Sequence, residues 1–550
     1  MLLVNIEMRD DMDMVFHYQD YTYEEPATGW VDGVYYPRLV TKRNSHHFLR
    51  EENGFLVVRS RVWREIEETG YGIFYYEEST QFITEWKGNN YEVRITFINP
   101  TSDAYTCHIR VNDVVKEEAV TVQPGEEVHV LLIACMTNGI CRLCFAAGAM
   151  SEIEDSVITG EVYIKDITVT PEEEKQRREK PRLFLVSDST VQSYEKRFYP
   201  QTGWGQVLYQ FFDGADRYRE YRAEHSTYSL ARTYELPELT IENRSIGGRS
   251  ARSFYDEGKL DQILEIICPG DYMFVQFAHN DATAIRPNRY IAPDEFPYYI
   301  QRYIDACKRR QVQCVLVTPV AMRTCGEDGV FSISFAAYRE SMIEIAREQK
   351  VPLLDLGARS TAYLNQIGTE ESKHIYLWVK EGEYPDGAYA AGVSDKAHLQ
   401  EYGAKVYANM IAEMLVEYHA DHSLDLLKKL AAPKKEIEKP KPYKEMGEGQ
   451  EKPTDMVSGF VVQEISNENG RGSFLLNWNL VEHAVAYHVY RKKKEELTFE
   501  VVRTVTEEEK RELATLPFTA DLGYVWQYYI TAVFENGSEG HASRLLEVAL

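Results

Sequence analysis

Hydrophobic and polar residues alternate over the first third of the chain. Val93, Ile95 and Phe97 are apolar, whereas the residues between them are polar or charged. A period of two is typical of a β-strand that buries one face, and turn residues separate several runs of this kind. We therefore predict a β-sandwich over residues 1–175, bounded by the charged stretch Pro171–Pro181, which we interpret as a linker.

Aromatic residues on these predicted strands leave two interpretations of the first domain open. Tyr75, Tyr76 and Trp86 would suit carbohydrate binding if their rings face solvent. Aromatic residues in strands usually pack in a core instead, and the domain would then brace its neighbour. An accessory carbohydrate-binding domain and a packing domain are both consistent with this pattern.

The period changes after residue 181, where short apolar runs alternate with helical patterns. The predicted strands are Leu183–Val186, Tyr272–Phe277, Val312–Val317 and Val351–Leu356. The predicted helices are Trp204–Phe212, Leu260–Ile267, Tyr298–Arg310, Phe335–Lys350 and Leu399–Tyr418. Such alternation predicts an α/β domain over residues 182–420, with a parallel sheet covered by helices on both faces. The loops that follow the strands then meet at one edge of the sheet, where sites form.

The pattern changes again near residue 420. Residues 421–455 are rich in Lys, Pro and Glu, and we interpret them as a solvated linker. Residues 456–550 return to strand patterns, one of which ends at Trp478. This segment resembles a fibronectin type III domain, with Trp478 at the place of the buried tryptophan. The resemblance implies a second β-sandwich and says nothing about catalysis.

Composition narrows the partners and the location. The chain has 550 residues, with 61 Lys and Arg against 87 Asp and Glu, a net charge of −26. This balance argues against nucleic acid or an anionic membrane surface as a partner, and the sequence leaves the oligomeric state open. The beginning, MLLVNIEMRDDMDM, does not resemble a signal peptide. We expect a cytoplasmic location, or an extracellular one if the native N-terminus was altered.

The eight scattered cysteines fit buried free thiols. Cys141 and Cys144 have the spacing of a metal-binding pair, but no second pair or histidine cluster completes a zinc site. We therefore predict no metal.

Four polar blocks of the middle domain carry the candidate chemistry, and each lies near a strand end or in a loop. They are Ser187–Thr190, Asn243–Arg252, Phe277–Asp281 and Asp395–His398. Taken singly, each block fits an ordinary turn, a tight bend or a packed histidine. The four together, in this order, favour a catalytic site.

These blocks contain the groups that acyl transfer requires. Ser189 would be the nucleophile and His398 the base that takes its proton. Asp395, three residues before His398, is close enough to orient the imidazole and stabilise its charged form. The backbone N–H groups of Ser189 and Gly248 and the side-chain amide of Asn280 would bind the oxyanion.

The order Ser, Gly, Asn, Asp-x-x-His resembles the SGNH (GDSL-type) hydrolases. The segments DSTV, GWGQ, IGGRSARSF, FAHND and DKAH are similar to the rhamnogalacturonan acetylesterases of carbohydrate esterase family twelve. The resemblance covers about residues 182–418 and implies a flavodoxin-like three-layer fold without metal or cofactor. It also implies that Ser189, Asp395 and His398 form the triad, and that Ser189, Gly248 and Asn280 form the oxyanion hole.

Three departures from the family pattern affect specificity more than chemistry. Ser187 stands where many members have glycine, Ala278 replaces the glycine of FGHND, and DKAH replaces DxTH. None of these changes removes a catalytic atom.

Substrate recognition is less defined by the sequence. Arg249 and Arg252, together with Arg244, would pair with a galacturonate carboxylate or with structural acids such as Asp256. Trp204 would stack on a sugar at the floor of the cleft, or pack in the core.

The sequence thus predicts a multidomain carbohydrate O-acetylesterase acting on acetylated pectic rhamnogalacturonan or its oligosaccharides. The first alternative is the same chemistry on another glycan, such as xylan or homogalacturonan. The second is a non-catalytic carbohydrate-binding or scaffold protein. A lipase or thioesterase is disfavoured because no apolar lid-like segment lies near the motifs.

Overall fold

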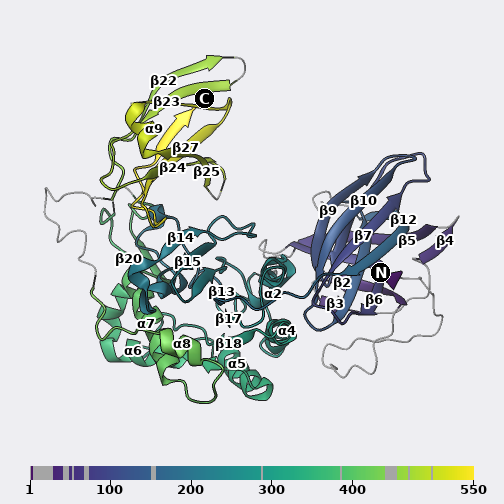
Figure 1. Cartoon of the computed structure of the whole chain (residues 1–550), viewed down its shortest axis with the longest axis horizontal. Coiled ribbons are helices and arrows are strands. Elements are labelled where there is room, and N and C mark those ends of the chain that lie inside the picture. Colours follow the sequence, from purple (N-terminus) through teal and green to yellow (C-terminus); the bar gives the residue numbers. More distant parts are fainter. Residues whose placement is uncertain are drawn as a thin grey trace.

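The computed structural model describes residues 73–149, 157–286, 289–384, 387–439, 455–468, 471–496, 499–513 and 515–550, and strand segments between residues 2 and 66. The chain forms three regions: an N-terminal β region, a middle α/β domain and a C-terminal β region (Figure 1).

The middle domain is built on a mixed sheet of seven strands in the order β14-β15-β16-β13-β17-β18-β19. The strands are β13 (Arg182–Val186), β14 (Arg219–Arg222), β15 (Arg232–Glu235), β16 (Thr240–Asn243), β17 (Tyr272–Val275), β18 (Gln313–Val317) and β19 (Leu353–Leu354). The strands from β16 to β19 are parallel, as the sequence predicts. The antiparallel hairpin β14–β15 extends one edge of the sheet.

Helices cover both faces of this sheet. Leu183 and Leu185 of β13 belong to one core, whereas Phe184 and Val186 belong to the other. The helices of the first core are α1 (Trp204–Val207), α6 (Leu356–Glu371), α7 (Glu401–Glu417) and α8 (Asp425–Leu430). Those of the second are α2 (Ala251–Asp256), α3 (Lys259–Leu264), α4 (Phe296–Arg309) and α5 (Ala336–Gln349). Short 3₁₀ turns occupy Lys196–Phe198, Leu208–Phe211, Ala215–Arg217 and Ser372–His374.

Helix α8 corrects the expected linker. Leu427 and Leu430 are buried in the first core, so the middle domain continues past residue 420. The charge pattern suggested solvated chain because the apolar face of this one-and-a-half-turn helix is short. Residues 440–454 of the expected linker lie outside the described residues.

The N-terminal region is one antiparallel sheet of twelve strands. They are β1 (Leu2–Leu3), β2 (Gly29–Tyr36), β3 (Arg38–Val40), β4 (Leu49–Glu52), β5 (Phe55–Ile66), β6 (Ile73–Glu85), β7 (Asn90–Ile98), β8 (Tyr105–Val111), β9 (Val114–Val122), β10 (Glu127–Cys135), β11 (Ile140–Ala147) and β12 (Ile158–Pro171). Phe97 of β7 and Phe145 of β11 pack edge to face at 6.1 Å, although three strands separate β7 from β11 in the sheet order. The sheet therefore folds over, and strands that lie far apart in its order pack in the same core.

The structure describes one of the three aromatic side chains considered for carbohydrate binding. Trp86 is buried and packs on Tyr91, with ring centroids 4.4 Å apart, so its ring is unavailable to a carbohydrate. The side chains of Tyr75 and Tyr76 lie outside the described residues.

The C-terminal region contains a three-stranded and a four-stranded sheet, in the orders β22-β23-β26 and β25-β24-β27-β28. The elements are β22 (Val461–Glu468), β23 (Arg471–Asn477), β24 (Ala486–Lys493), β25 (Glu500–Thr506), α9 (Glu507–Glu512), β26 (Leu516–Asp521), β27 (Val525–Val533) and β28 (Leu546–Ala549). One core contains side chains from both sheets, including Trp478, whose ring packs on Tyr487 at 5.6 Å.

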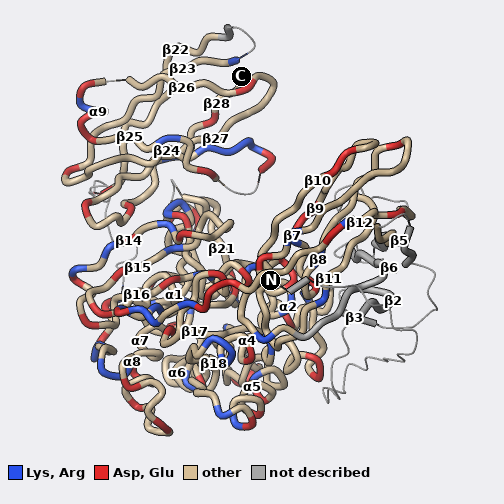
Figure 2. Tube along the Cα trace, turned by 45° about the vertical axis from the view of Figure 1, so that its right-hand side comes forward, with Lys and Arg blue, Asp and Glu red and all other residues tan. Residues whose placement is uncertain are grey.

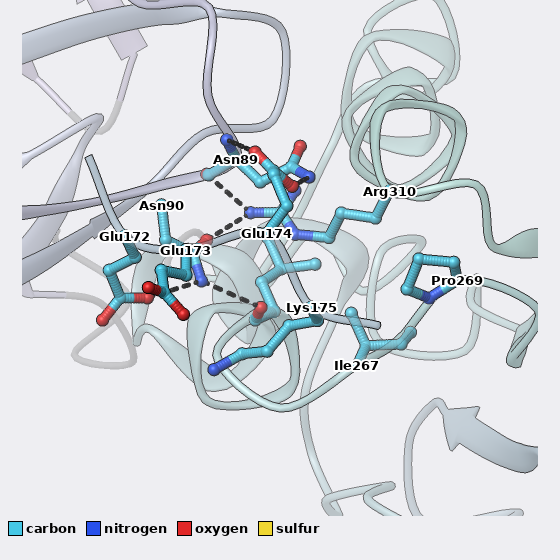
Figure 3. A pocket seen from close by; sticks show the side chains of 10 residues that line it. Asn89, Asn90, Glu172, Glu173, Glu174, Lys175, Ile267, Pro269 and Arg310 are labelled. Atoms are coloured by element: carbon cyan, nitrogen blue, oxygen red, sulfur yellow. Dashed lines mark hydrogen bonds between the residues drawn. The ribbon is translucent and has the colours of Figure 1, made fainter. Parts of the chain in front are cut away.

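Arg310, at the end of α4, joins the N-terminal region to the middle domain (Figure 3). Its guanidinium donates to the Asn89 carbonyl and to Oδ1 of Asn90, at 2.9 and 2.6 Å. It also donates to the Met136 carbonyl at 2.7 Å. The Asn90 amide in turn donates to the Leu264 carbonyl in α3, at 3.4 Å. These buried bonds cross the boundary in both directions, so the two regions are joined by more than the connecting chain.

The turn between β27 and β28 joins the C-terminal region to the edge hairpin of the middle domain. The Asn536 carbonyl accepts from the Glu220 N–H at 2.7 Å. A Cβ on Gly537 would lie 1.9 Å from the Glu220 carbonyl oxygen, so only glycine permits this approach.

Acidic and basic residues are interspersed over the described part of the chain (Figure 2), so any site for an anion has to be built locally.

Candidate active site

Ser189 lies on the loop that follows β13 at the carboxyl edge of the parallel sheet. β13 runs between β16 and β17, so this loop faces the loops after both of those strands. Phe184 and Val186 anchor the strand in the core, and Ser189 is partly exposed. A buried strand thus fixes a serine hydroxyl at the place where α/β domains form their sites.

The structure brings Ser189, His398 and Asp395 together across 209 residues of sequence. Nε2 of His398 lies 3.0 Å from the Ser189 hydroxyl, and Nδ1 of His398 lies 2.8 Å from Oδ2 of Asp395. These are hydrogen-bond distances, and the order of the groups is hydroxyl, imidazole and carboxylate. The chain of contacts can pass a proton from Ser189 to His398 while Asp395 holds the ring.

Asp395 and His398 lie in a bulged strand, whereas the sequence suggested a loop before a helix. β21 (Val393–Leu399) pairs with β20 (Tyr376–Val379), but its register shifts between Ser394 and Leu399. Asp395 Oδ1 accepts from the backbone N–H groups of Ala397 and His398, at 2.7 and 2.8 Å. The bulge therefore frees the two side chains from the ladder, and the carboxylate itself stabilises the bulge.

These contacts keep Asp395 ionised. Burial raises its pKa, but hydrogen bonding and the charge of His398 lower it, as do the two backbone N–H groups. The net effect is a pKa of about 2. Because the charged form is the one that can stabilise an imidazolium, Asp395 stays in its useful state in all but strongly acidic solution.

A buried polar network holds the serine loop from behind. Trp204 Nε1–H donates to Gln276 Oε1 at 3.1 Å, and Gln276 Nε2–H donates to Thr190 Oγ1 at 2.9 Å. Thr190 donates through both its backbone N–H and its hydroxyl to Asp188 Oδ1, at 2.8 Å each. Gln276, at the end of β17, thereby fixes the residues on both sides of Ser189.

The second and third blocks meet beside this loop. Gly248 has a φ of +76°, a conformation that favours glycine. The Asn280 amide donates to the carbonyl of Arg249, the next residue, at 3.1 Å. Within the described residues, the N–H groups of Ser189 and Gly248 have no acceptor. The glycine loop is thus bonded to the Asn280 loop through Arg249 and to the serine loop through Ile246. The two backbone N–H groups remain available, as an oxyanion site requires.

Gln192 fixes the glycine loop, a role that sequence reasoning missed. Its Oε1 accepts from the Gly247 N–H at 2.5 Å and from the Tyr228 hydroxyl at 2.9 Å. Tyr194, also unpredicted, donates its hydroxyl to the Ser189 carbonyl at 2.7 Å. Both residues follow Ser189 closely in sequence, but glutamine and tyrosine after a serine are too common to mark a residue as part of a site.

The two early departures from the family pattern have local consequences. The Ser187 hydroxyl donates to the Gln276 carbonyl at 2.5 Å, so the side chain that replaces glycine ties β13 to β17. Ala278 has a φ of +148°, a region in which a residue with a Cβ is strained. The turn before His279 is therefore built in a glycine-like conformation without glycine.

Trp204, Arg244 and Arg252 occupy the alternative positions that the sequence left open, a core position for Trp204 and pairing with acids for the two arginines. The Trp204 ring is 1% exposed and packs in the first core, so it cannot stack on a sugar. Arg244 is buried against Glu242 at 2.5 Å, and Arg252 pairs with Asp256 at 3.3 Å. Arg249 is partly exposed but pairs with Glu257 at 2.9 Å. Helical spacing and charge could not show which of these side chains already have partners.

Asp281 is a buried acid beside the proposed oxyanion residue. Its Oδ1 accepts from the Ala251 N–H at the start of α2, at 2.8 Å. Burial raises its pKa to about 8, against the opposing effect of that N–H, and the charge of Asp188 adds to the rise. Asp281 is therefore mainly protonated in the folded protein at neutral pH.

We expect Asp281→Asn to flatten the dependence of stability on pH. The folded state holds this proton up to about pH 8, whereas an unfolded aspartate loses it near pH 4. Wild-type stability should therefore fall as pH rises between these values, and the uncharged amide of the variant removes that fall. At pH 8 the variant should melt at least about 2 °C higher than the wild type, as measured by calorimetry.

The matched control for this test is Asp294→Asn, at an exposed aspartate. It should leave the pH dependence as in the wild type. Equal slopes for wild type and Asp281→Asn between pH 5 and 8 would contradict the raised pKa of Asp281.

Metal binding has no evident place in the described part of the chain. No group of three or more His, Cys, Asp or Glu is arranged there to hold an ion. Cys141 and Cys144 are buried and form no disulfide, as is true of all the other cysteines except Cys325, which forms no disulfide but is exposed. Among the described residues, no helix is both long enough and apolar enough to cross a membrane.

Comparison with known proteins finds relatives of the middle domain. "Probable rhamnogalacturonan acetylesterase YesY" of Bacillus subtilis is 34% identical over 237 residues, which are 43% of this chain and 92% of the relative. "Rhamnogalacturonan acetylesterase RhgT" of the same organism is 31% identical over 236 residues, 43% of this chain and 90% of the relative. A crystal structure of Bacillus subtilis YxiM matches 65% of this chain and 88% of its own, with 22% identity and a TM-score of 0.33. No protein-family model matches the chain.

The two acetylesterase relatives place this chain among the carboxylic-ester hydrolases of the SGNH (GDSL-type) superfamily. Within that superfamily, the chain belongs to the rhamnogalacturonan acetylesterase-like family. The family resemblance inferred from the motifs is thereby confirmed for the middle domain.

Proposed function

We propose that this protein removes O-acetyl groups from pectic rhamnogalacturonan or its oligosaccharides, through an acetyl-enzyme on Ser189. The observation that carries the proposal is the contact chain from Ser189 through His398 to Asp395, at 3.0 and 2.8 Å. The names of the two Bacillus relatives, both rhamnogalacturonan acetylesterases, support the class of substrate.

In the first step, Oγ of Ser189 attacks the acetyl carbonyl carbon while Nε2 of His398 accepts the serine proton. The carbonyl oxygen becomes an oxyanion, which the N–H groups of Ser189 and Gly248 and the amide of Asn280 stabilise. The bond between the acetyl carbon and the sugar oxygen then breaks. His398 returns the proton to that oxygen, and the sugar leaves with a free hydroxyl.

In the second step, water replaces the sugar. His398 accepts a proton from water, and the water oxygen attacks the acetyl carbon of the acetyl-serine. The intermediate collapses, acetate leaves, and Ser189 regains its proton. Asp395 remains ionised throughout and stabilises the imidazolium that forms in both steps.

Asn280→Ala is expected to lower kcat about 10²–10³-fold, because it removes one donor that acts on the charge formed in the transition state. KM should change by less than about threefold, since the ground-state carbonyl depends less on this donor. Steady-state rates on an aryl acetate measure both constants.

Asn365→Ala is the matched control, since the Asn365 amide also donates to a backbone carbonyl, that of Phe331, at 2.9 Å. This control should reduce stability and leave kcat unchanged. An Asn280→Ala variant with wild-type kcat would contradict the place of Asn280 in the oxyanion hole.

The substrate is tested by acetate release from acetylated rhamnogalacturonan and from acetylated xylan. Release that is faster by an order of magnitude or more from the pectic substrate would support the proposal. Equal release from both would retain an acetylesterase and refute the pectic preference. No release from either, by a folded protein, would favour the alternative of a non-catalytic carbohydrate-binding or scaffold protein.

The flanking regions support the enzyme in this proposal. The C-terminal region, which we continue to interpret as fibronectin type III-like, borders a cavity of about 250 Å³ together with the loop after Ser189. Tyr194 lines this cavity and also bonds the Ser189 carbonyl. Loss of the C-terminal region would therefore disturb the loop that carries the nucleophile.

A further inference from the structure

Arg289 covers the glycine of the proposed oxyanion site. A Cβ built on Gly248 would lie 3.0 Å from Nη1 of Arg289 and 3.1 Å from both Cζ and Nη2. Three guanidinium atoms at nearly one distance mean that the flat face of the group lies against the glycine. Gly248 thus serves two purposes, because its φ of +76° favours glycine and its missing side chain leaves room for this cation.

The guanidinium lies close to a backbone nitrogen of the proposed oxyanion site. Within one residue, Cβ and N lie about 2.5 Å apart, so the 3.0 Å contact places Nη1 within about 5.5 Å of the Gly248 nitrogen. That nitrogen is a proposed donor to the oxyanion. A substrate that places its acetyl group there also brings its sugar ring beside Arg289.

Arg289 is half-buried and lacks a protein partner in the described part of the chain. None of the described side chains or carbonyls accepts a hydrogen bond from its guanidinium, and no described carboxylate forms an ion pair with it. The acid that acts on it, Glu257, is already paired with Arg249 at 2.9 Å. By contrast, Arg244 and Arg252 are buried with acids of their own.

The surroundings of Arg289 are cationic although the chain is strongly acidic. Burial lowers the pKa of its guanidinium, and the charges of Arg286 and Arg249 lower it further. A half-buried cation among like charges is unfavourable unless an anion joins it. A carboxylate suits this position, because its two oxygens match the parallel N–H groups of one guanidinium edge.

We propose that Arg289 binds the carboxylate of a uronic acid, on the sugar ring that carries the acetyl group or on the ring linked to it. This inference rests on the proposed function, and it identifies the residue that distinguishes acidic from neutral acetylated glycans. Acetylated xylan without uronic acid substituents has no carboxylate that can pair with Arg289. Arg249 adds positive potential and remains paired with Glu257.

The experiment compares wild type, Arg289→Gln, Arg289→Lys and Arg286→Gln on acetylated rhamnogalacturonan oligosaccharides and acetylated xylo-oligosaccharides. We expect Arg289→Gln to lower the ratio of kcat/KM for the acidic over the neutral substrate about 10–100-fold, mainly through KM, as for loss of a charged hydrogen bond. Arg289→Lys should recover part of the ratio. Arg286→Gln removes a neighbouring, exposed charge and should keep the ratio within about threefold.

Salt provides a second measurement. Added salt should lower kcat/KM of the wild type on the acidic substrate, and Arg289→Gln should lose most of this dependence. If Arg289→Gln lowers kcat/KM for both substrates by the same factor, the residue only positions Gly248 and the inference is wrong. An unchanged ratio with unchanged rates would also overturn it. Failure of the proposed function can be distinguished from failure of this inference. If Ser189→Ala stayed active on either substrate, the proposed function itself would be wrong.

Discussion

Ser189→Ala is expected to lower kcat/KM for acetate release about 10⁴–10⁶-fold, the scale on which serine hydrolases respond to loss of the nucleophile. The variant lacks the oxygen that forms the acetyl-enzyme, and only the oxyanion donors and substrate binding remain. The Ser189 hydroxyl contacts His398 at 3.0 Å and no other described side chain. The melting temperature should therefore stay within about 2 °C of the wild type. Acetate release and calorimetry on the full chain measure both quantities.

The triad predicts a further property that a merely structural serine would not show. His398→Ala should lose a similar factor, and the double variant Ser189→Ala/His398→Ala should lie within about tenfold of either single variant. Residues that act in one chemical step are non-additive, because losing either one already abolishes the covalent pathway. Two losses that multiply in full would mean that Ser189 and His398 act separately. Full activity of Ser189→Ala would remove the nucleophile from the proposal.

Asp395→Asn is expected to lower kcat about 10²–10⁴-fold. Asp395 accepts a hydrogen bond from the N–H group at Nδ1 of His398, at 2.8 Å. The proton therefore stays on Nδ1, and Nε2 is free to accept the Ser189 proton. An asparagine amide can instead donate to Nδ1, which favours the tautomer with the proton on Nε2 and blocks the base. It also lacks the charge that stabilises the imidazolium. KM should change little, because the carboxylate is engaged by His398 and by the backbone N–H of Ala397.

The chain contains a matched control for this variant. Asp425 pairs with Nδ1 of His422, three residues away, and the distance is again 2.8 Å. Both side chains of this pair are exposed. Asp425→Asn should leave kcat unchanged. In Asp395→Asn, the side-chain oxygen of the new amide can still accept from the N–H groups of Ala397 and His398, so the bulge should persist. An Asp395→Asn variant with wild-type kcat would show that His398 needs no partner.

Asp395 also gives stability a pH dependence opposite to that of Asp281. Its pKa is held at about 2, below its ordinary value of 3.8. The stabilisation from this carboxylate is present above about pH 4 and is lost as pH falls toward 2. Asp281 destabilises the folded state as pH rises from 4 to 8. The middle domain thus holds a partly exposed acid that is stabilising when charged and a buried acid that is stabilising when neutral.

Local pattern was sufficient to predict much of this protein. The apolar run of β13 and the abrupt polar residues after it predicted a serine at a strand end, which is where Ser189 lies. Alternation of strands and helices predicted the parallel strands β13, β17, β18 and β19. The spacing of Asp395 and His398 was itself informative, because three residues are few enough for the two side chains to meet. These features are local, so the sequence contains them directly.

The tertiary structure decided everything that depends on a distant partner. Apolar residues at helical spacing show that Trp204 has a buried side but not whether a sugar or the Gln276 side chain meets it. Arg244 and Arg249 look alike in sequence, yet one is buried against Glu242 and the other stays partly exposed. Arg289 gave no signal because its role depends on Gly248, 41 residues earlier. Periodicity reports which face of an element is buried, whereas charge pairing and close approach depend on which elements the fold brings together.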